Sequence, residues 1–142
     1  MVDLVNAKTP GSNLLTGGQP TVEQLGEVKA AGYRTIINLR GVGEAGTDVE
    51  PELVRSLGLV YHHLPIHGAQ GVNFDSAAQF AEILEAAEGP VVVHCASGNR
   101  VGALFALKAY KVDGKSADDA LSEGVQTGLT GLEGHVRQLL GL

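Results

Sequence analysis

Short apolar runs alternate along the chain with segments in which apolar residues recur every three or four positions. Continuous runs rich in β-branched residues are typical of buried strands, and helical recurrence is typical of helices that cover a sheet. The predicted strands are residues 14–16, 35–39, 59–64 and 91–93. Six helices are predicted between and after these strands. In chain order, the first begins after residue 21, the second spans 51–57, and the third runs from 75 or 76 to 88. The fourth begins near residue 101, the fifth near residue 116, and the last spans 132–140. The alternation predicts one α/β domain, residues 1–142, whose central, mostly parallel sheet of about four or five strands is flanked by helices.

Capping residues define several of the predicted helix boundaries. Thr21, with Gln24 three positions later, has the capping-box pattern, and Gly32 is the expected stop of that helix. Asp75 or Ser76 is the expected cap of the helix that ends near residue 88.

Composition narrows the classes of function. A chain of 142 residues with 44% hydrophobic residues suits one globular core, and its net charge of −6 disfavours nucleic acid and anionic membranes as partners. Residues 1–10 lack the basic and apolar segments of a signal peptide, and no apolar run reaches membrane-spanning length. We therefore expect a cytoplasmic protein without a membrane partner.

The most informative segment begins at Cys95, the one cysteine, which directly follows the most apolar predicted strand. Ligands of open parallel sheets gather at the carboxyl ends of the strands, and the start of a helix offers free N–H groups and a positive dipole end. Gly98 allows the backbone to turn successive N–H groups inward, and Arg100 adds a planar, charged fork that matches two oxygens of a phosphate-like group. These surroundings favour the thiolate, so we expect Cys95 to be a nucleophile rather than a structural thiol.

Residues 94–100, His-Cys-Ala-Ser-Gly-Asn-Arg, resemble the catalytic loop of protein tyrosine and dual-specificity phosphatases. Gln19-Pro20, the strand that ends at Arg40 and residues 62–66 extend the likeness to a bacterial phosphatase-like family, which is also found fused in beta-lactamase-hydrolase-like proteins. The resemblance covers about residues 12–112. It implies a cysteine-phosphatase-like fold and hydrolysis of phosphate monoesters, phosphotyrosine or another phosphoprotein among them.

The implied mechanism is an in-line attack by Cys95 that forms a phosphocysteine, which water then hydrolyses. The resemblance assigns phosphate binding to Arg100 and to the loop residues Ala96, Ser97, Gly98 and Asn99. The expected partner is a phosphorylated protein or a small-molecule phosphate ester.

Two departures from the phosphatase pattern leave other functions open. Four residues separate Cys95 from Arg100, whereas phosphatases have five, and four is similar to the loop of single-domain rhodaneses, which carry a persulfide and transfer sulfur. Val101 stands where phosphatases usually have Ser or Thr. A rhodanese-like sulfurtransferase with a Cys95 persulfide is therefore one alternative, and a non-catalytic phosphate-binding module is another.

The general acid and the remaining contacts to substrate are less defined. His67 occupies the neighbourhood in which dual-specificity phosphatases have an Asp, and Asp75 is the nearest carboxylate, so both are candidate acids. Arg40, at the end of a strand, is a candidate for binding an anionic substrate. We expect neither a cofactor nor a metal, because the histidines fit no common zinc spacing.

Overall fold

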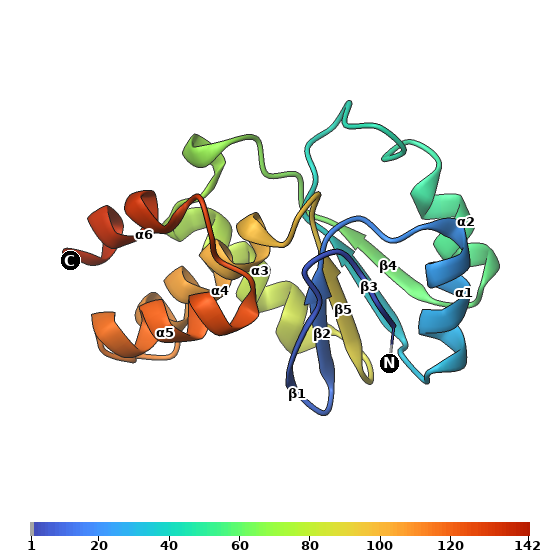
Figure 1. The fold of residues 1–142 in the computed structure, drawn as a ribbon, viewed down its shortest axis with the longest axis horizontal. Coiled ribbons are helices and arrows are strands. Elements are labelled where there is room, and N and C mark those ends of the chain that lie inside the picture. The colour runs from blue at the N-terminus through green and yellow to red at the C-terminus, as the bar shows by residue number, and fades with distance from the viewer. Residues whose placement is uncertain (1) are drawn as a thin grey trace.

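The computed structural model describes residues 2–142 and shows an α/β fold built on one five-stranded sheet (Figure 1). The spatial order of the strands is β1-β2-β5-β3-β4, in which β2, β5, β3 and β4 run parallel and β1 pairs with β2 in the antiparallel sense. The strands are β1 (Lys8–Gly11), β2 (Leu14–Gly17), β3 (Thr35–Asn38), β4 (Val60–His63) and β5 (Val91–His94). The predicted class, a mostly parallel sheet flanked by helices, is confirmed.

Helices cover both faces of the sheet, with α1 and α2 on one face and α3 and α4 on the other (Figure 1). The last two helices, α5 and α6, pack against α4, and α5 also contacts β1 at the edge of the sheet. The helices are α1 (Val22–Ala30), α2 (Glu50–Ser56), α3 (Phe74–Ala86), α4 (Asn99–Lys111), α5 (Ala117–Thr127) and α6 (Glu133–Leu140), and a 3-10 turn, η1, spans Ala69–Gly71.

The central strands are apolar throughout because both of their faces are buried. Successive side chains of a strand point to opposite faces, so Ile36 and Val92 contact the α1 and α2 side while Ile37 and Val93 contact the α3 and α4 side. All four are fully buried. This packing fixes the end of β5, and therefore the start of the segment that follows it.

The predicted capping box of α1 is present: Gln24 N–H donates to Thr21 Oγ1 at 3.1 Å, and Thr21 N–H donates to Gln24 Oε1 at 3.0 Å. The predicted cap of α3 is wrong. Asn73 is the N-cap, because its Oδ1 accepts from Ser76 N–H at 2.8 Å, and Asp75 therefore lies inside the first turn. Helix α4 also begins earlier than predicted, at Asn99.

Strand β1 was not predicted because its four residues are all exposed and show no apolar alternation. It is an edge strand that pairs with β2 and also contacts α5. Among residues 2–142, no helix is both long and apolar enough to cross a membrane.

Candidate active site

Cys95 lies between the carboxyl end of β5, a central strand, and the first turn of α4. The loop from Cys95 to Arg100 is therefore fixed at both ends by buried elements. Its Cys95 residue is only 1% exposed, so the sulfur lies at the base of the loop. The sequence predicts a nucleophilic thiol, and the structure buries this residue almost completely.

The carbonyl groups of residues 95–98 each face a polar group of the surrounding structure. Cys95 C=O faces His94 Nδ1 at 3.3 Å, Ala96 C=O accepts from Gln19 N–H at 3.2 Å, and Gly98 C=O accepts from Gly102 N–H at 3.1 Å. Asn6 Nδ2–H donates to the remaining carbonyl, that of residue 97, at 3.0 Å. Every carbonyl of the segment is thus held by a partner that belongs to the surrounding structure.

This arrangement determines where the N–H groups point. The C=O and the N–H of one trans peptide point in opposite directions, so each fixed carbonyl turns the N–H of the next residue the other way. Gly98 N–H donates to Cys95 Sγ at 3.1 Å, which is the contact this geometry requires, and Gly98 has a positive φ of 94°. Among residues 2–142 we find no acceptor for the N–H groups of Ala96, Ser97 or Asn99. A ring of such free N–H groups is an anion site.

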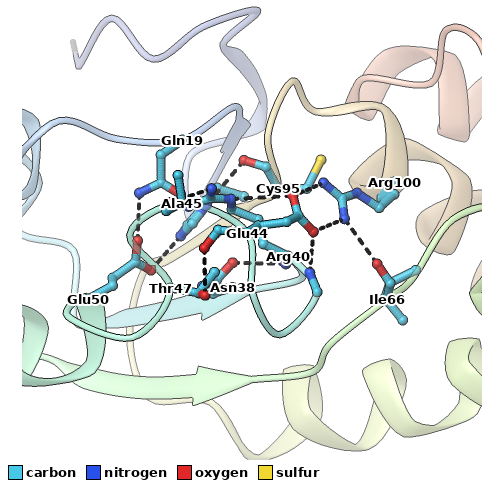
Figure 2. A network of polar contacts seen from close by, with 12 residues as sticks. Gln19, Asn38, Arg40, Glu44, Ala45, Thr47, Glu50, Ile66, Cys95 and Arg100 are labelled. Atoms are coloured by element: carbon cyan, nitrogen blue, oxygen red, sulfur yellow. Dashed lines mark hydrogen bonds and ion pairs between the residues drawn. The ribbon is translucent and has the colours of Figure 1, made fainter.

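Arg100 is clamped by a carboxylate that the sequence did not suggest. Glu44 accepts from Arg100 Nη1–H at 2.7 Å and from Nη2–H at 2.9 Å, and Nη1 also donates to the carbonyl of Ile66 at 3.0 Å. Figure 2 shows Glu44 between Arg40 and Arg100, with the Cys95 sulfur beside the Arg100 guanidinium. Three of the five guanidinium N–H groups are therefore used. In the described part of the chain, no oxygen acceptor meets Nε–H or the second Nη2–H, and the Cys95 sulfur is the polar atom beside them.

The charges of this pair stabilise each other. Hydrogen bonds from Arg100 hold the pKa of Glu44 at about 2, with smaller contributions from Gly41 N–H and from the charges of Arg100 and Arg40, against the effect of burial. The hydrogen bonds to Glu44 raise the pKa of Arg100, and the nearby Cys95 adds to that effect. Glu44 is therefore an anion at any working pH and has no proton to give to a leaving group.

A second, buried network lies behind the loop. His94 Nε2 lies 2.7 Å from Glu50 Oε2, and Gln19 Nε2–H donates to Glu50 Oε1 at 2.6 Å. Burial alone would raise the pKa of Glu50, but the hydrogen bond and charge of His94, together with the Gln19 amide, lower it. Because His94 directly precedes Cys95, this network holds the base of the loop.

Arg40 belongs to the same network. It is 6% exposed, its Nη1–H donates to Gln19 Oε1 at 2.5 Å, and its Nη2–H donates to the carbonyl of Ala45 at 2.5 Å. Its Nε lies 3.6 Å from the Glu44 carboxylate. Substrate binding by Arg40 stays a prediction, and these internal contacts favour a structural part for the residue.

The two candidate acids differ in their surroundings. His67 is exposed and follows Ile66, whose carbonyl Arg100 holds, and the His67 ring lies so close to Gly41 that a Cβ there would be 2.5 Å from Nδ1. Asp75 is exposed on the first turn of α3, and none of the hydrogen bonds within residues 2–142 joins its side chain to the loop. The structure therefore brings His67 to the edge of the site, and it shows no such contact for Asp75 within the described residues.

The side chain of Asn99 connects the loop to the end of the chain. Asn99 Oδ1 accepts from the N–H groups of Thr130 and Leu132, at 2.9 and 3.1 Å, and Gly128 lies so close that a Cβ there would be 2.7 Å from the Gly98 carbonyl. The α5–α6 connection thus forms one wall of the site. In the part of the chain that the structure describes, no group of three or more His, Cys, Asp or Glu residues lies close enough to hold a metal ion.

Sequence reasoning missed Glu44, Glu50 and Asn6. Glu44 lies in a glycine-rich loop, and Glu50 begins α2, so neither has a local pattern that distinguishes it from a surface carboxylate. A buried acidic residue shows itself only through a partner that is distant in sequence. Asn6 is the one non-glycine residue among those described with a positive φ, which the sequence does not reveal.

A central parallel strand, a turn with a cysteine at its base and an arginine at the start of the next helix together define the cysteine-phosphatase class of fold. Residues 8–112 match the family described as "Beta-lactamase hydrolase-like protein, phosphatase-like domain". The chain belongs to this family, and the resemblance seen in its sequence is confirmed.

Relatives and solved structures agree with this assignment. A beta-lactamase hydrolase-like protein of Xylella fastidiosa (strain Temecula1) is 37% identical over 110 residues, which are 75% of this chain and 25% of that protein. Its counterpart in Agrobacterium fabrum is 33% identical over 98 residues, 66% of this chain and 22% of that protein. The chain thus spans about a quarter of the length of the curated relatives it matches.

In fold, the chain is similar to TpbA of P. aeruginosa in complex with phosphotyrosine. The TM-score is 0.74 at 20% identity, and the match covers 96% of this chain and 83% of TpbA. It is also similar to Tk-PTP in its active form, with a TM-score of 0.68 at 19% identity, over 96% of this chain and 97% of that one. At such identities the likeness concerns the fold alone.

Proposed function

We propose that the chain is a cysteine-dependent phosphatase that hydrolyses phosphate monoesters through a phosphocysteine at Cys95. The observation that carries the proposal is the loop itself, in which fixed carbonyls turn the N–H groups of Ala96, Ser97 and Asn99 away from the surrounding structure. These groups and the free edge of Arg100 match the oxygens of a phosphoryl group. The phosphatase-like family assignment agrees with this chemistry.

The reaction has two displacements. The Cys95 thiolate attacks phosphorus, the bond from phosphorus to the ester oxygen breaks, and the leaving group takes a proton. Water then attacks the phosphocysteine, which releases inorganic phosphate and restores the thiolate. In both steps the loop N–H groups and Arg100 stabilise charge on the phosphoryl oxygens, which is where this type of catalysis gains most of its rate.

Glu44 prepares Arg100 for this task. By holding Nη1 and one N–H of Nη2, the carboxylate orients the guanidinium so that its other edge, Nε–H and the second Nη2–H, is available to two phosphoryl oxygens.

The leaving group is the demanding part of the reaction. Glu44 is ionised, no hydrogen bond within residues 2–142 joins Asp75 to the loop, and His67 follows the residue whose carbonyl Arg100 holds. We therefore propose aryl phosphates, phosphotyrosine among them, as the preferred class, since a phenol leaves with less help from an acid than an alkyl alcohol does.

This preference is testable with two substrates and two variants. His67→Gln should lower the turnover of an alkyl phosphate much more than that of p-nitrophenyl phosphate, and Asp75→Asn should change neither. A large effect of Asp75→Asn on the alkyl substrate alone would make Asp75 the acid instead.

A second function, sulfur transfer, is favoured by the length of the loop and by Val101. The Cys95 thiolate would attack the outer sulfur of thiosulfate, sulfite would leave as the S–S bond breaks, and the resulting persulfide would pass its sulfur to cyanide as thiocyanate. No alcohol leaves in this route, so it needs no general acid. Thiosulfate is also an oxyanion, which the same N–H groups and Arg100 can bind. Binding of phosphate without turnover is the remaining alternative.

One preparation should be tested in both assays, phosphate release from p-nitrophenyl phosphate and thiocyanate formation from thiosulfate and cyanide. Cys95→Ser should abolish whichever activity is found, and Arg100→Lys should lower kcat by about 100-fold, as the loss of an oxyanion donor does. Arg137→Lys is the matched control, because Arg137 pairs with Glu133 on α6. Phosphate release that persists in Cys95→Ser would contradict the proposal, and thiocyanate formation alone would replace it with the second function.

A further inference from the structure

The segment before β1 contacts the catalytic loop from outside the region that the family match covers. The match begins at residue 8, whereas Asn6 Nδ2–H donates to the Ser97 carbonyl at 3.0 Å across 91 positions of sequence. The segment is held in place by Val5 C=O, which accepts from Gly18 N–H at 2.7 Å. The contact between Asn6 and the loop is thus part of a fixed layer, although Asn6 itself is exposed.

The backbone of Asn6 is in a conformation that most residues avoid. Its φ of 52° lies in the left-handed region, and every other residue among those described with a positive φ is a glycine. Asn tolerates this region better than other non-glycine residues, but glycine would do so at no cost. Asn therefore fits this backbone conformation and, unlike glycine, also supplies a side-chain amide that donates to the loop.

The close approach of this segment also depends on two glycines at the end of β2. A Cβ on Gly17 would lie 2.8 Å from Leu4 Cβ, and a Cβ on Gly18 would lie 2.4 Å from the Ala96 carbonyl oxygen and 2.9 Å from Val5 Cβ. Such distances are not compatible with a side chain. The absence of side chains at both positions therefore allows the N-terminal segment, β2 and the catalytic loop to stack directly on one another.

We propose that Asn6 is a positioning residue for the nucleophile. It acts through one peptide group: by holding the Ser97 carbonyl, it turns the N–H of that same peptide, which belongs to Gly98, toward Cys95 Sγ at 3.1 Å. Among the carbonyls of residues 95–98, that of Ser97 is the one that accepts from a side chain of the N-terminal segment. The inference rests on the proposed function only in that the reaction uses the Cys95 thiolate, and both candidate reactions do.

The test compares Asn6→Gly and Asn6→Asp with the wild type. Glycine removes the amide and keeps the backbone conformation, while aspartate keeps the shape and cannot donate while ionised. Asp3→Asn is the matched control, because Asp3 is exposed in the same segment and no hydrogen bond within residues 2–142 involves its side chain. The thermal midpoint of each variant shows whether the fold is retained.

The decisive measurement is the amide proton resonance of Gly98 by NMR, which reports the hydrogen bond to sulfur. In both Asn6 variants it should move upfield, and kcat of the active reaction should fall by about fivefold, as expected for weakening one hydrogen bond to a charged group. Asp3→Asn should match the wild type in both.

The outcomes separate this inference from the proposed function. If the wild type turns over neither p-nitrophenyl phosphate nor thiosulfate, but the Gly98 resonance moves in both Asn6 variants, the proposed function is wrong and the positioning role stands. If the Gly98 resonance in the Asn6 variants stays within the range of Asp3→Asn, the inference is wrong, whatever the activity of the wild type.

Discussion

The ion pair between Glu44 and Arg100 makes a quantitative prediction about stability and pH. The pKa of Glu44 is lowered from its ordinary value of 4.5 to about 2. At about 1.4 kcal/mol per pKa unit, this corresponds to roughly 3 kcal/mol in favour of the ionised, folded form. The Glu44 side chain is 32% exposed, so solvent screens the pair, and we reduce the expected contribution to about 1–2 kcal/mol.

The sign of the pH dependence follows from the direction of the shift. A carboxyl whose pKa is lower in the folded protein contributes its stability fully above the unfolded value of 4.5, and this contribution is lost as the pH falls toward 2. Glu44→Gln should therefore lower the free energy of unfolding by about 1–2 kcal/mol at pH 7, and most of that difference should be gone at pH 3.

Urea unfolding at pH 7 and pH 3 measures both quantities. Glu88→Gln is the matched control, because Glu88 pairs with Arg34 at 3.6 Å and both side chains are about two thirds exposed. That variant should lie within about 0.5 kcal/mol of the wild type at either pH. A Glu44→Gln effect that is equal at the two pH values, or no larger than that of Glu88→Gln at pH 7, would refute the reasoning.

Three further predictions concern the buried network, the packing of the last helices and the thiol. Glu50→Gln should lower the free energy of unfolding by about 3 kcal/mol in urea unfolding, because it leaves His94 without its buried carboxylate; a loss below 1 kcal/mol would mean that the pair is not needed. Gly102→Ala should lower the free energy of unfolding in urea by about 1–3 kcal/mol, since its Cβ would lie 2.0 Å from a backbone nitrogen of the α5–α6 connection. Gly26→Ala is the control: its Cβ would have nothing within 4 Å, so this variant should raise the free energy of unfolding by about 0.5–1 kcal/mol. Peroxide should abolish the proposed activity, and an added thiol should restore it, because a sulfenate on Cys95 has no second cysteine with which to form a disulfide; full resistance to peroxide would argue against a reactive thiolate.

The elements that the sequence predicts well are those whose signals are local. The apolar runs at β3 and β5, the capping box at Thr21 and the Ser116 cap of α5 all appear where expected, because neighbouring residues determine them. Strand β1 and the cap of α3 are different. The strand exists only because β2 offers an edge, and Asn73 competes successfully with the residues that follow it.

The same distinction applies to the site. Cys95, Gly98 and Arg100 lie within six positions, so their chemistry can be read from one loop. Their partners Glu44 and Asn6 are 56 and 91 positions away from the groups they contact. Only the folded chain brings these polar groups to the loop, and no periodicity marks them beforehand.

The wall that α5 and α6 provide has a practical consequence for anyone who excises or transplants this domain. The family match ends at residue 112, yet Thr130 and Leu132 bind the Asn99 side chain, and Leu129 and Val136 are buried against the α4 side of the core. A chain cut at the end of the match would keep the cysteine and arginine of the loop, but it would lose the contacts that α5 and α6 make with the loop and with α4. Any excised or transplanted domain should therefore include residues 113–142.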